Sequence, residues 1–370
     1  MDQGMKSIVV SGINLNEGGT LSVFKDCLDY LSRQFSHKYQ IIALVHDVNL
    51  FQTPNITYYE FKDSKSSWLK RLRYEYIHFA KLSRQIHPHL WLSMHDITPN
   101  IQADIKSVYC HNPSIFYNMP FKDILCEPKV FLFSLFYRYL YAINIRKNDY
   151  VIVQQDWIRD EFKRMYYLKD VIVAYPDVDI HADNVKTDCK TDSIVRFFYP
   201  SFPRTFKNFE IICDAVSILE ARGINNFEVL LTINGSETSY SRRVFRQYTK
   251  LSRVKFIGLQ SRENVYKYYN QCDCLIFASK LETWGMPITE YKLSGKPMLL
   301  ANLRYAHETA GTYEQVKFFD PEQPEELANC MEGIIKGTLR YDKTVGRVIE
   351  EPFARTWEEM FNILLEEKGA

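Results

Sequence analysis

Glu282 and Glu290 are the residues of this sequence whose types and spacing point most directly to chemistry. The apolar run 273–279 before them predicts a buried strand, and residues 297–301 after them predict another. Between the strands we expect a helix over about 287–294, because a proline begins it and a glycine follows it, which is the usual order of helix punctuation. One glutamate therefore lies in a loop that follows a strand, and the other lies in the next helix.

This placement favours the binding of a sugar that is joined to an anion. In an open parallel sheet, ligands bind beyond the carboxyl ends of the strands, where helix N-termini present unpaired N–H groups to an anion. Carboxylates accept hydrogen bonds from neighbouring hydroxyls, so Glu282 and Glu290 would hold uncharged parts of the same ligand. A glycosidase needs its carboxylates about 5–9.5 Å apart, whereas a helical rise over this spacing gives about 12 Å. The pair therefore predicts donor binding rather than hydrolysis.

The same stretch resembles the donor-binding motif of the retaining GT-B glycosyltransferases of the family-four type, also called glycosyl transferases group 1. That motif has two glutamates separated by seven residues, with an aromatic–glycine pair and a proline between them, here Trp284, Gly285 and Pro287. The resemblance implies that Glu282 contacts the transferred sugar and that Glu290 contacts the ribose of the nucleotide. The donor-binding residues that it implies are Gly18, Gly19, Thr283, Trp284, Gly285, Met286 and Glu290.

Arg204 and Lys207 follow a strand expected at 194–199 and precede a helix. At this edge of a sheet their charges can reach a diphosphate, where they would stabilise the charge that develops on a leaving nucleoside diphosphate. The resemblance implies that role for an arginine and a lysine of this loop. Here the two are only three residues apart, closer than the commoner family spacing, so the resemblance is stronger for Lys207.

Two features of the first half add to the predicted site. Gly18 and Gly19 lie between a strand and a helix, where the backbone can approach a ligand, and they resemble the family's glycine loop that faces the donor diphosphate. Their spacing is not the G-x-G-x-x-G of dinucleotide enzymes, which argues against a nicotinamide or flavin cofactor. His111 ends a strand expected at 106–110; a lone histidine is more often structural, but family members resemble this chain in having one beside the transferred sugar. The catalytic residues that the resemblance implies are His111, Arg204, Lys207 and Glu282.

Asp177 and Asp179 match the Asp-x-Asp metal motif of the other, GT-A, class of glycosyltransferases. They lie in a polar stretch after the last strand of the first half, which is the wrong position for that role. Without another carboxylate cluster of suitable spacing, no metal is implied. No other cofactor is implied either, and the resemblance implies a UDP- or GDP-sugar as the donor substrate.

The order of the predicted elements indicates two Rossmann-like α/β domains in tandem. The 370 residues suffice for two domains of about 150 residues each, and strands alternate with helices as they do in parallel sheets covered on both faces. The predicted division is 1–176 for an acceptor-side domain, 177–193 for a linker, 194–350 for a nucleotide-sugar domain and 351–370 for a C-terminal helix. The GT-B resemblance implies that the domains face each other across a cleft and that this helix packs back on the first.

The alternating apolar pattern predicts strands in both halves of the chain and long helices in the first half. Strands are expected near 6–11, 39–45, 89–94, 106–110, 149–153, 171–175, 194–199, 227–233, 253–257, 273–277 and 297–301. Long helices of the first half are expected near 20–35, 67–86, 129–146 and 156–166.

Composition excludes several classes of protein. With 46 basic and 45 acidic residues the net charge is +1, so no overall field favours nucleic acid. The eight cysteines lack paired spacing, and the chain opens without a secretory apolar region, so we expect reduced thiols and a cytoplasmic location. The apolar stretch 130–144 is shorter than the about 18–20 residues that span a bilayer. It either packs on the sheet or lies on the inner face of a membrane as a peripheral helix.

These observations and the resemblance predict a retaining, metal-independent glycosyltransferase. It would move a sugar from a nucleotide-diphosphate sugar to a hydroxyl of a glycan or lipid-linked acceptor and, by family analogy, would act in surface polysaccharide biosynthesis. Two alternatives stay open: a GT-B sugar-nucleotide epimerase, which needs no acceptor, and a non-catalytic GT-B binding partner, which has no use for the charged residues above. The nucleobase, the sugar, the acceptor and the oligomeric state do not follow from the sequence.

Overall fold

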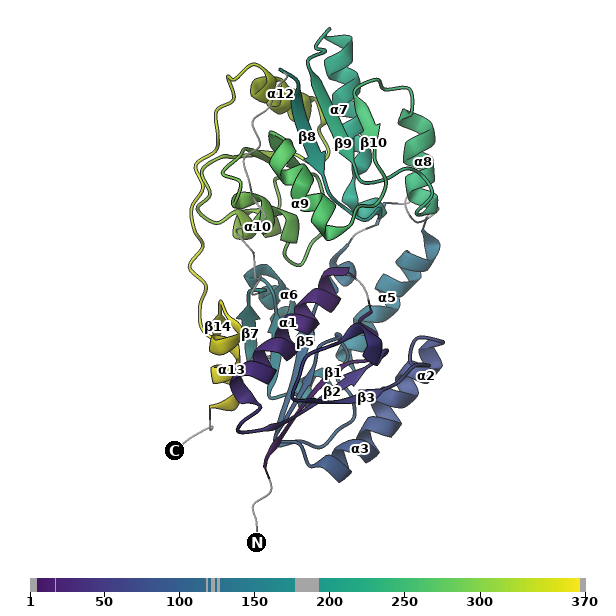
Figure 1. The fold of residues 1–370 in the computed structure, drawn as a ribbon, viewed down its shortest axis with the longest axis vertical. Helices are drawn as coiled ribbons and strands as arrows, with labels where there is room; N and C mark the ends of the chain where they lie inside the picture. Colours follow the sequence, from purple (N-terminus) through teal and green to yellow (C-terminus); the bar gives the residue numbers. More distant parts are fainter. Residues whose placement is uncertain are drawn as a thin grey trace. The chain divides into compact units, whose positions relative to one another are not determined.

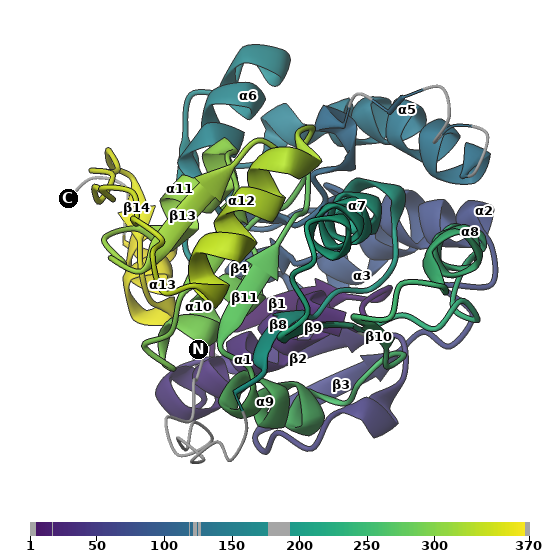
Figure 2. The same ribbon diagram turned by 90° about the horizontal axis from the view of Figure 1, so that it is seen from above.

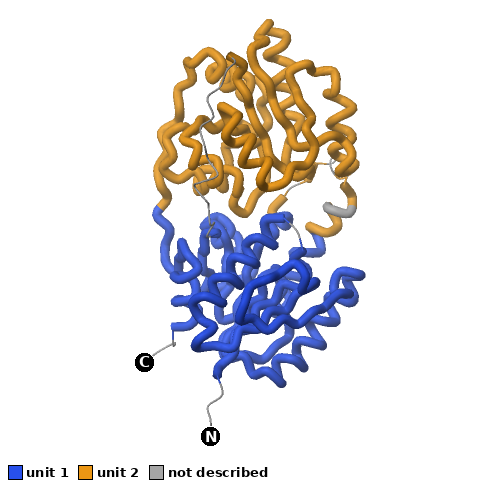
Figure 3. The backbone as a smooth tube through the Cα atoms, in the orientation of Figure 1, with its two compact units in different colours: residues 1–115, 135–179, 348–370 blue, residues 116–134, 180–347 orange. Residues whose placement is uncertain are grey.

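The structure is a computed structural model that describes residues 5–16, 18–117, 119–120, 124, 127–176 and 193–366 (Figure 1). The described residues form two compact units, drawn in different colours in Figure 3. Unit 1 draws its residues from 1–115, 135–179 and 348–370, and unit 2 draws them from 116–134 and 180–347. Apart from Ser193, the predicted linker at 177–193 lies outside the described residues, and so do Asp177 and Asp179.

Unit 1 is built on a parallel sheet whose described strands number eight, in the order β14-β7-β6-β5-β4-β1-β2-β3. The strands are β1 Ser7–Gly12, β2 Gln40–Val45, β3 Ile56–Glu60, β4 Leu90–Ser93, β5 Ile105–Cys110, β6 Tyr150–Val153, β7 Val171–Ala174 and β14 Phe353–Ala354. The strand order reverses between β1 and β4. Such a switch point is where open α/β sheets bind ligands, beyond the carboxyl ends of the strands.

Helices cover both faces of this sheet, because the side chains of a strand alternate between its faces. On one face, Ile8 and Val10 of β1 share a buried cluster with residues of α1 and α13. On the other face, Val9 of β1 and Trp91 of β4 pack with Phe79 of α3. The main helices of the first half are α1 Gly18–Phe35, α2 Trp68–Arg73, α3 Phe79–Ile86, α5 Pro128–Ala142 and α6 Asp156–Tyr166.

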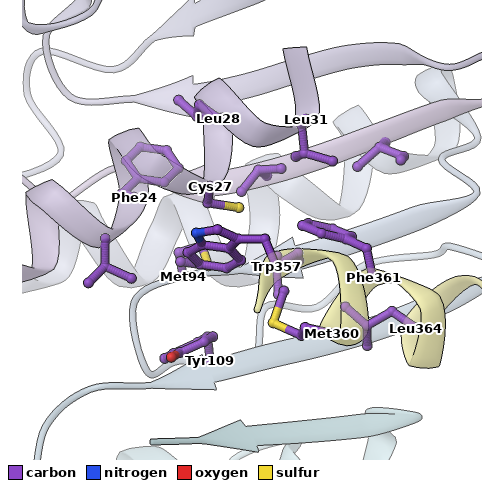
Figure 4. Packing of buried hydrophobic residues seen from close by; sticks show 14 of the residues in the cluster. Phe24, Cys27, Leu28, Leu31, Met94, Tyr109, Trp357, Met360, Phe361 and Leu364 are labelled. Atoms are coloured by element: carbon purple, nitrogen blue, oxygen red, sulfur yellow. The ribbon is translucent and has the colours of Figure 1, made fainter. Parts of the chain in front are cut away.

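The C-terminal strand and helix of the described chain complete unit 1. In β14, Phe353 pairs with Val173 of β7, which extends the sheet at its edge. Helix α13, Trp357–Leu365, then points Trp357 and Phe361 into the cluster that Phe24 and its neighbours on α1 form (Figure 4). The apolar residues of α13 are therefore part of the core of unit 1.

Unit 2 is built on a second parallel sheet, in which the described strands have the order β10-β9-β8-β11-β12-β13. The strands are β8 Val195–Tyr199, β9 Phe227–Leu231, β10 Val254–Phe256, β11 Cys274–Phe277, β12 Met298–Ala301 and β13 Val316–Phe319. Here the order reverses between β8 and β11, which is the arrangement of a Rossmann-like nucleotide-binding sheet.

Helices also line both faces of the second sheet. Figure 2 shows α7 and α12 together on one side of its strands and α9 and α10 on the other. The helices are α7 Phe209–Ala221, α8 Ser239–Tyr248, α9 Arg262–Gln271, α10 Met286–Lys292, α11 Arg304–Ala310 and α12 Pro324–Ile335.

The structure differs from the sequence-based expectations in several elements. Strands β3, β13 and β14 were not predicted, and residues 116–134, which we assigned to the first domain, pack in unit 2. The helix expected over 67–86 is divided into α2 and α3 by a π-helical turn, η2, at Tyr74–His78. Every helix among the described residues is too short or too polar to cross a membrane.

Candidate functional site

The loops that follow β8 and β11 bring three of the predicted site residues to the switch point of unit 2. Arg204 and Lys207 lie in the loop after β8, and Glu282 lies in the loop after β11. The two strands are neighbours in the sheet, with Cys274 paired to Phe197, so their loops leave the same edge side by side. The two loops are about 80 residues apart in sequence, and they become neighbours only because β8 and β11 pair in the sheet.

Lys207 and Glu282 form an ion pair between these two loops, from Lys207 Nζ to Glu282 Oε1. Their side chains are only 16% and 15% exposed, so the pair is largely withdrawn from water. The ammonium group also lies over the ring of Phe277, the last residue of β11, at 5.9 Å from the centroid. Withdrawing both charges from water costs desolvation energy, which offsets the attraction between them. The ion pair is therefore better explained by a role in ligand recognition than by a role in stability.

The backbone around Lys207 explains how its side chain reaches Glu282. Residues Thr205–Lys207 form a 3₁₀ turn, η6, and Asn208 ends it in the left-handed region with φ 56°. Buried Tyr199 donates its hydroxyl to the carbonyl of Lys207 at 2.7 Å. From the other loop, the N–H of Lys280 donates to the carbonyl of Phe206 at 2.7 Å. The two loops are thus joined by backbone as well as by charge.

Arg204 lies at the start of η6 but is not part of the Lys207–Glu282 pair. Its side chain is 43% exposed, its guanidinium lies 3.4 Å from Glu127 Oε1, and it stacks over Phe202 at 5.2 Å from the ring centroid. Arg204 therefore remains accessible to an anion from solvent.

Glu290 lies on α10 and is buried, with 9% of its surface exposed. The hydroxyl of Tyr269 on α9 donates a hydrogen bond to Glu290 Oε2 at 2.9 Å, and Arg262 Nη2 lies 3.9 Å from Oε1. Burial raises the pKa of Glu290, and the hydrogen bonds and the arginine only partly oppose that rise. The carboxylate is thus held in a fixed orientation by groups that the sequence motif does not contain.

The loop between the two glutamates is shaped by Gly285 and Trp284. Gly285 has φ 86°, and a Cβ there would lie 3.1 Å from Ile288 Cδ1, so a side chain would be strained and crowded. Trp284 is buried; its indole N–H donates to Thr289 Oγ1 at 2.8 Å, and its carbonyl accepts from Thr309 Oγ1. Helix α10 begins directly afterwards at Met286. The aromatic–glycine pair therefore positions the loop, whereas Thr283 and Met286 are partly exposed beside it.

In unit 1, His111 follows β5 and is buried, with its ring stacked on Tyr109 at 4.4 Å between centroids. Its Nε2 atom is buried and makes no hydrogen bond within the described part of the chain. Burial lowers the pKa of His111 to about 4, although Asp96 opposes that change. The imidazole is therefore neutral near pH 7 and has an unused nitrogen.

Asp96 is a residue of this region that sequence reasoning missed. It follows β4 with φ 75°, and its Oδ1 accepts the backbone N–H groups of His111 at 2.6 Å and Asn112 at 3.0 Å. The hydroxyls of Tyr137 and Tyr141 on α5 also donate to its carboxylate, at 3.0 and 2.8 Å. Its position directly after a strand was a usable signal, but nothing in the sequence indicated these partners.

Gly18 and Gly19 lie at the first turn of α1, which begins at Gly18. Gly18 has φ 72°, and a Cβ built on either glycine meets no atom of the described residues within 4 Å, its chain neighbours aside. These described residues therefore leave room for a ligand to approach the backbone at the start of α1. No group of three or more His, Cys, Asp or Glu side chains suited to a metal ion occurs within the described ranges.

Comparisons with known proteins agree with this arrangement. Residues 179–348 match the family model for glycosyl transferases group 1. None of the curated proteins matches the chain by sequence. Three solved structures illustrate the structural matches. Sucrose-phosphate synthase from Thermosynechococcus elongatus is 14% identical with a TM-score of 0.63, and 90% of each chain is covered.

The other two are HepE from Anabaena and the galactosyltransferase WaaB. HepE in complex with UDP-glucose is 17% identical with a TM-score of 0.63, again over 90% of each chain. WaaB, a lipopolysaccharide outer core galactosyltransferase, is 15% identical with a TM-score of 0.63 over 91% of this chain and 92% of its own. At these identities the likeness concerns the fold, which is that of GT-B glycosyltransferases. The chain therefore has the GT-B fold, and its residues 179–348 match the family model for glycosyl transferases group 1.

Proposed function

We propose that the protein is a retaining glycosyltransferase that transfers a sugar from a nucleoside-diphosphate sugar to a hydroxyl of a glycan or lipid-linked acceptor. The observation that carries this proposal is the Lys207–Glu282 ion pair at the β8–β11 switch point. A sugar diphosphate presents an anion directly next to a ring of hydroxyls. Lys207 offers a cation for the diphosphate, and Glu282 beside it offers a hydrogen-bond acceptor for the sugar hydroxyls. Glu290, eight residues after Glu282, offers a second acceptor.

Each residue then has a distinct part in the reaction. The acceptor oxygen bonds to the anomeric carbon while the bond from that carbon to the diphosphate oxygen breaks, and the acceptor's proton passes to the departing diphosphate. Lys207 and Arg204 stabilise the charge that gathers on the diphosphate, taking the part that a metal ion has in other transferases. Glu282 accepts hydrogen bonds from the sugar, and Glu290 accepts them from the ribose. His111, with its neutral ring and unpaired Nε2, is proposed to lie beside the transferred sugar.

UDP is the first nucleotide to test, because HepE, a structural neighbour, is known in complex with UDP-glucose. We expect Lys207→Ala to lower kcat by about 10²–10³, the usual loss when one group that stabilises transition-state charge is removed. We expect Glu290→Ala to act mainly on the donor KM. Lys317→Ala is the matched control, since Lys317 also pairs with a carboxylate, Asp342, in unit 2.

The measurement is turnover of UDP- and GDP-sugars, with and without a glycan acceptor. Repeating it in EDTA tests the expected independence of a metal ion. Turnover of the donor to another sugar nucleotide without an acceptor would indicate an epimerase. Nucleotide binding without any turnover would indicate a non-catalytic partner. Wild-type kinetics in Lys207→Ala and Glu290→Ala alike would refute the donor site.

We also propose that a lipid-linked acceptor is met at a membrane surface by the part of α5 that belongs to unit 1. Phe136 and Tyr139 are 61% and 66% exposed, Leu135 of the same helix is also exposed, and so is Ile143, which follows the last residue of the helix. Exposed Arg146 and the following lysine add positive charge close to its end. The name of WaaB, a lipopolysaccharide enzyme, supports an acceptor in surface polysaccharide synthesis. Sedimentation with anionic phosphatidylglycerol vesicles tests the contact, which Phe136→Ser with Tyr139→Ser is expected to abolish.

A further inference from the structure

Glu127 is a buried carboxylate that neither the motif nor the proposed reaction uses. Its side chain is only 6% exposed. It lies directly before α5 in the segment 116–134, which comes from the first half of the sequence but packs in unit 2. A buried carboxylate at such a place needs partners to offset the loss of its hydration.

Its partners are in the turn that carries Lys207. Glu127 Oε2 accepts the backbone N–H of Thr205 at 3.0 Å, and Oε1 lies 3.4 Å from Arg204 Nη1. Thr205 is the first residue of η6, and Arg204, its N-cap residue, makes no side-chain cap hydrogen bond. Glu127 therefore supplies the cap that the turn lacks, from 78 residues earlier in the chain.

The same segment touches the turn a second time. The ring of Tyr117 meets the ring of Phe206 edge-on at 5.8 Å between centroids. Phe206 is also the residue whose carbonyl accepts from Lys280 in the loop of Glu282. The turn therefore contacts the loop after β11 through Phe206 and the earlier segment through Tyr117 and Glu127.

We propose that Glu127 is a positioning residue for the turn that binds the donor diphosphate. It fixes the N–H at the start of η6 and orients Arg204, so that Arg204 and Lys207 are held where charge develops in the reaction. It acts through these residues and does not contact the donor. This inference rests on the proposed function of the same turn.

The test compares Glu127→Ala with Glu127→Gln. Alanine removes the acceptor for the Thr205 N–H, whereas the glutamine amide oxygen can still accept it. We expect Glu127→Ala to lower kcat by between about tenfold and about a hundredfold, the range for a misplaced catalytic group, with little change in donor KM. Glu127→Gln is expected to recover most of that loss. A role in stability alone would lower the melting temperature and leave kcat of the folded protein unchanged.

Glu228→Ala and Glu228→Gln are the matched controls. Glu228 also pairs with an arginine of unit 2, Arg196 at 3.6 Å, but at the amino ends of β8 and β9, the edge opposite the turn. We expect wild-type kcat in both controls. Wild-type kcat in Glu127→Ala, or an equal loss in Glu127→Ala and Glu228→Ala, would overturn the inference.

Amide hydrogen exchange separates this inference from the proposed function. Exchange at Thr205 through Lys207 is expected to speed up in Glu127→Ala and to stay slow in the Glu228 variants, whether or not the protein turns over a donor. If the wild type shows no turnover but the turn loses protection in Glu127→Ala, only the proposed function fails. If the wild type turns over the donor and the turn stays protected in Glu127→Ala, only the positioning role fails.

Discussion

Replacement of Tyr269 by phenylalanine tests the donor site through a single hydroxyl group. Tyr269 is fully buried, and its hydroxyl donates to Glu290 Oε2 at 2.9 Å. Its ring packs against Phe198 and Tyr291, with centroids 5.8 and 5.4 Å away. Phenylalanine keeps these ring contacts, so Tyr269→Phe removes the hydrogen bond and leaves the packing in place.

The size of the effect follows from what the carboxylate loses. A hydrogen bond to a charged group contributes about 1.5–3 kcal/mol. Arg262 at 3.9 Å continues to favour the charged form, so we take the lower end of that range. If Glu290 binds the ribose as a carboxylate, this loss adds to the cost of ionising it. At a pH where Glu290 must lose its proton to bind, the affinity for UDP falls by up to about tenfold, since 1.4 kcal/mol is one factor of ten.

The pH dependence of binding gives the sign of the effect independently. Burial raises the pKa of Glu290, and the hydrogen bond from Tyr269 opposes that rise, so the pKa rises further in Tyr269→Phe. Only the ionised carboxylate accepts hydrogen bonds from both ribose hydroxyls, so binding weakens as the pH falls through this pKa. In the variant the weakening therefore begins at a higher pH than in the wild type.

Isothermal titration with UDP between about pH 5 and about pH 8, a span around the ordinary carboxyl and histidine ranges, measures both effects. Tyr248→Phe is the matched control, because buried Tyr248 also donates to a carboxylate of unit 2, Asp214 at 2.7 Å. If Tyr269→Phe binds UDP with wild-type affinity and an unchanged pH profile, Glu290 does not bind the nucleotide as a carboxylate and the assignment is wrong.

Two further predictions concern unit 1. Phe361→Ala is expected to lower the free energy of unfolding of unit 1 by about 3–5 kcal/mol, the usual cost of removing a buried aromatic ring, and to leave UDP affinity unchanged. Urea unfolding measures the first effect and titration with UDP measures the second. Equal urea midpoints for the variant and the wild type would contradict the packing of α13. His111 has a pKa near 4 when folded and an ordinary value of 6.5, so the unfolded chain takes up the proton first and unit 1 loses stability as pH falls between these values. His111→Gln should flatten this loss in urea unfolding at about pH 7 and about pH 5, and an unchanged slope would show that His111 does not titrate this way.

The parts of this protein that sequence reasoning could predict are those with a local signal. The segment with Glu282 and Glu290 is flanked by apolar runs and marked by proline and glycine, so the element types around it follow from neighbouring residues. Strand β3 has no such signal, because it is the edge strand of its sheet and none of its residues is buried. Strand β14 has only two residues, too few for any periodic pattern.

The supporting residues of the site could not be predicted for a different reason. Asp96 contacts His111 15 residues later, Tyr269 contacts Glu290 21 residues later, and Glu127 contacts Thr205 78 residues later. Each contact joins two elements that only the folded sheet brings together. No local pattern of residue types in a single sequence marks such a pair. The motif names groups that face a ligand, whereas the structure adds the groups that hold them.

The return of the chain to unit 1 affects how the protein is made. On the ribosome, strands β1 to β7 emerge first together with residues 116–134 of unit 2, the rest of unit 2 follows, and only afterwards do β14 and α13 arrive. Until then β7 lacks its neighbour on one side, and the part of the core around Phe24 is without Trp357 and Phe361. All residues of unit 2 are therefore synthesised before unit 1 is complete, although most of unit 1 is synthesised earlier. A nascent chain at this stage exposes an open strand edge and apolar side chains, which makes it a substrate for chaperones and proteases.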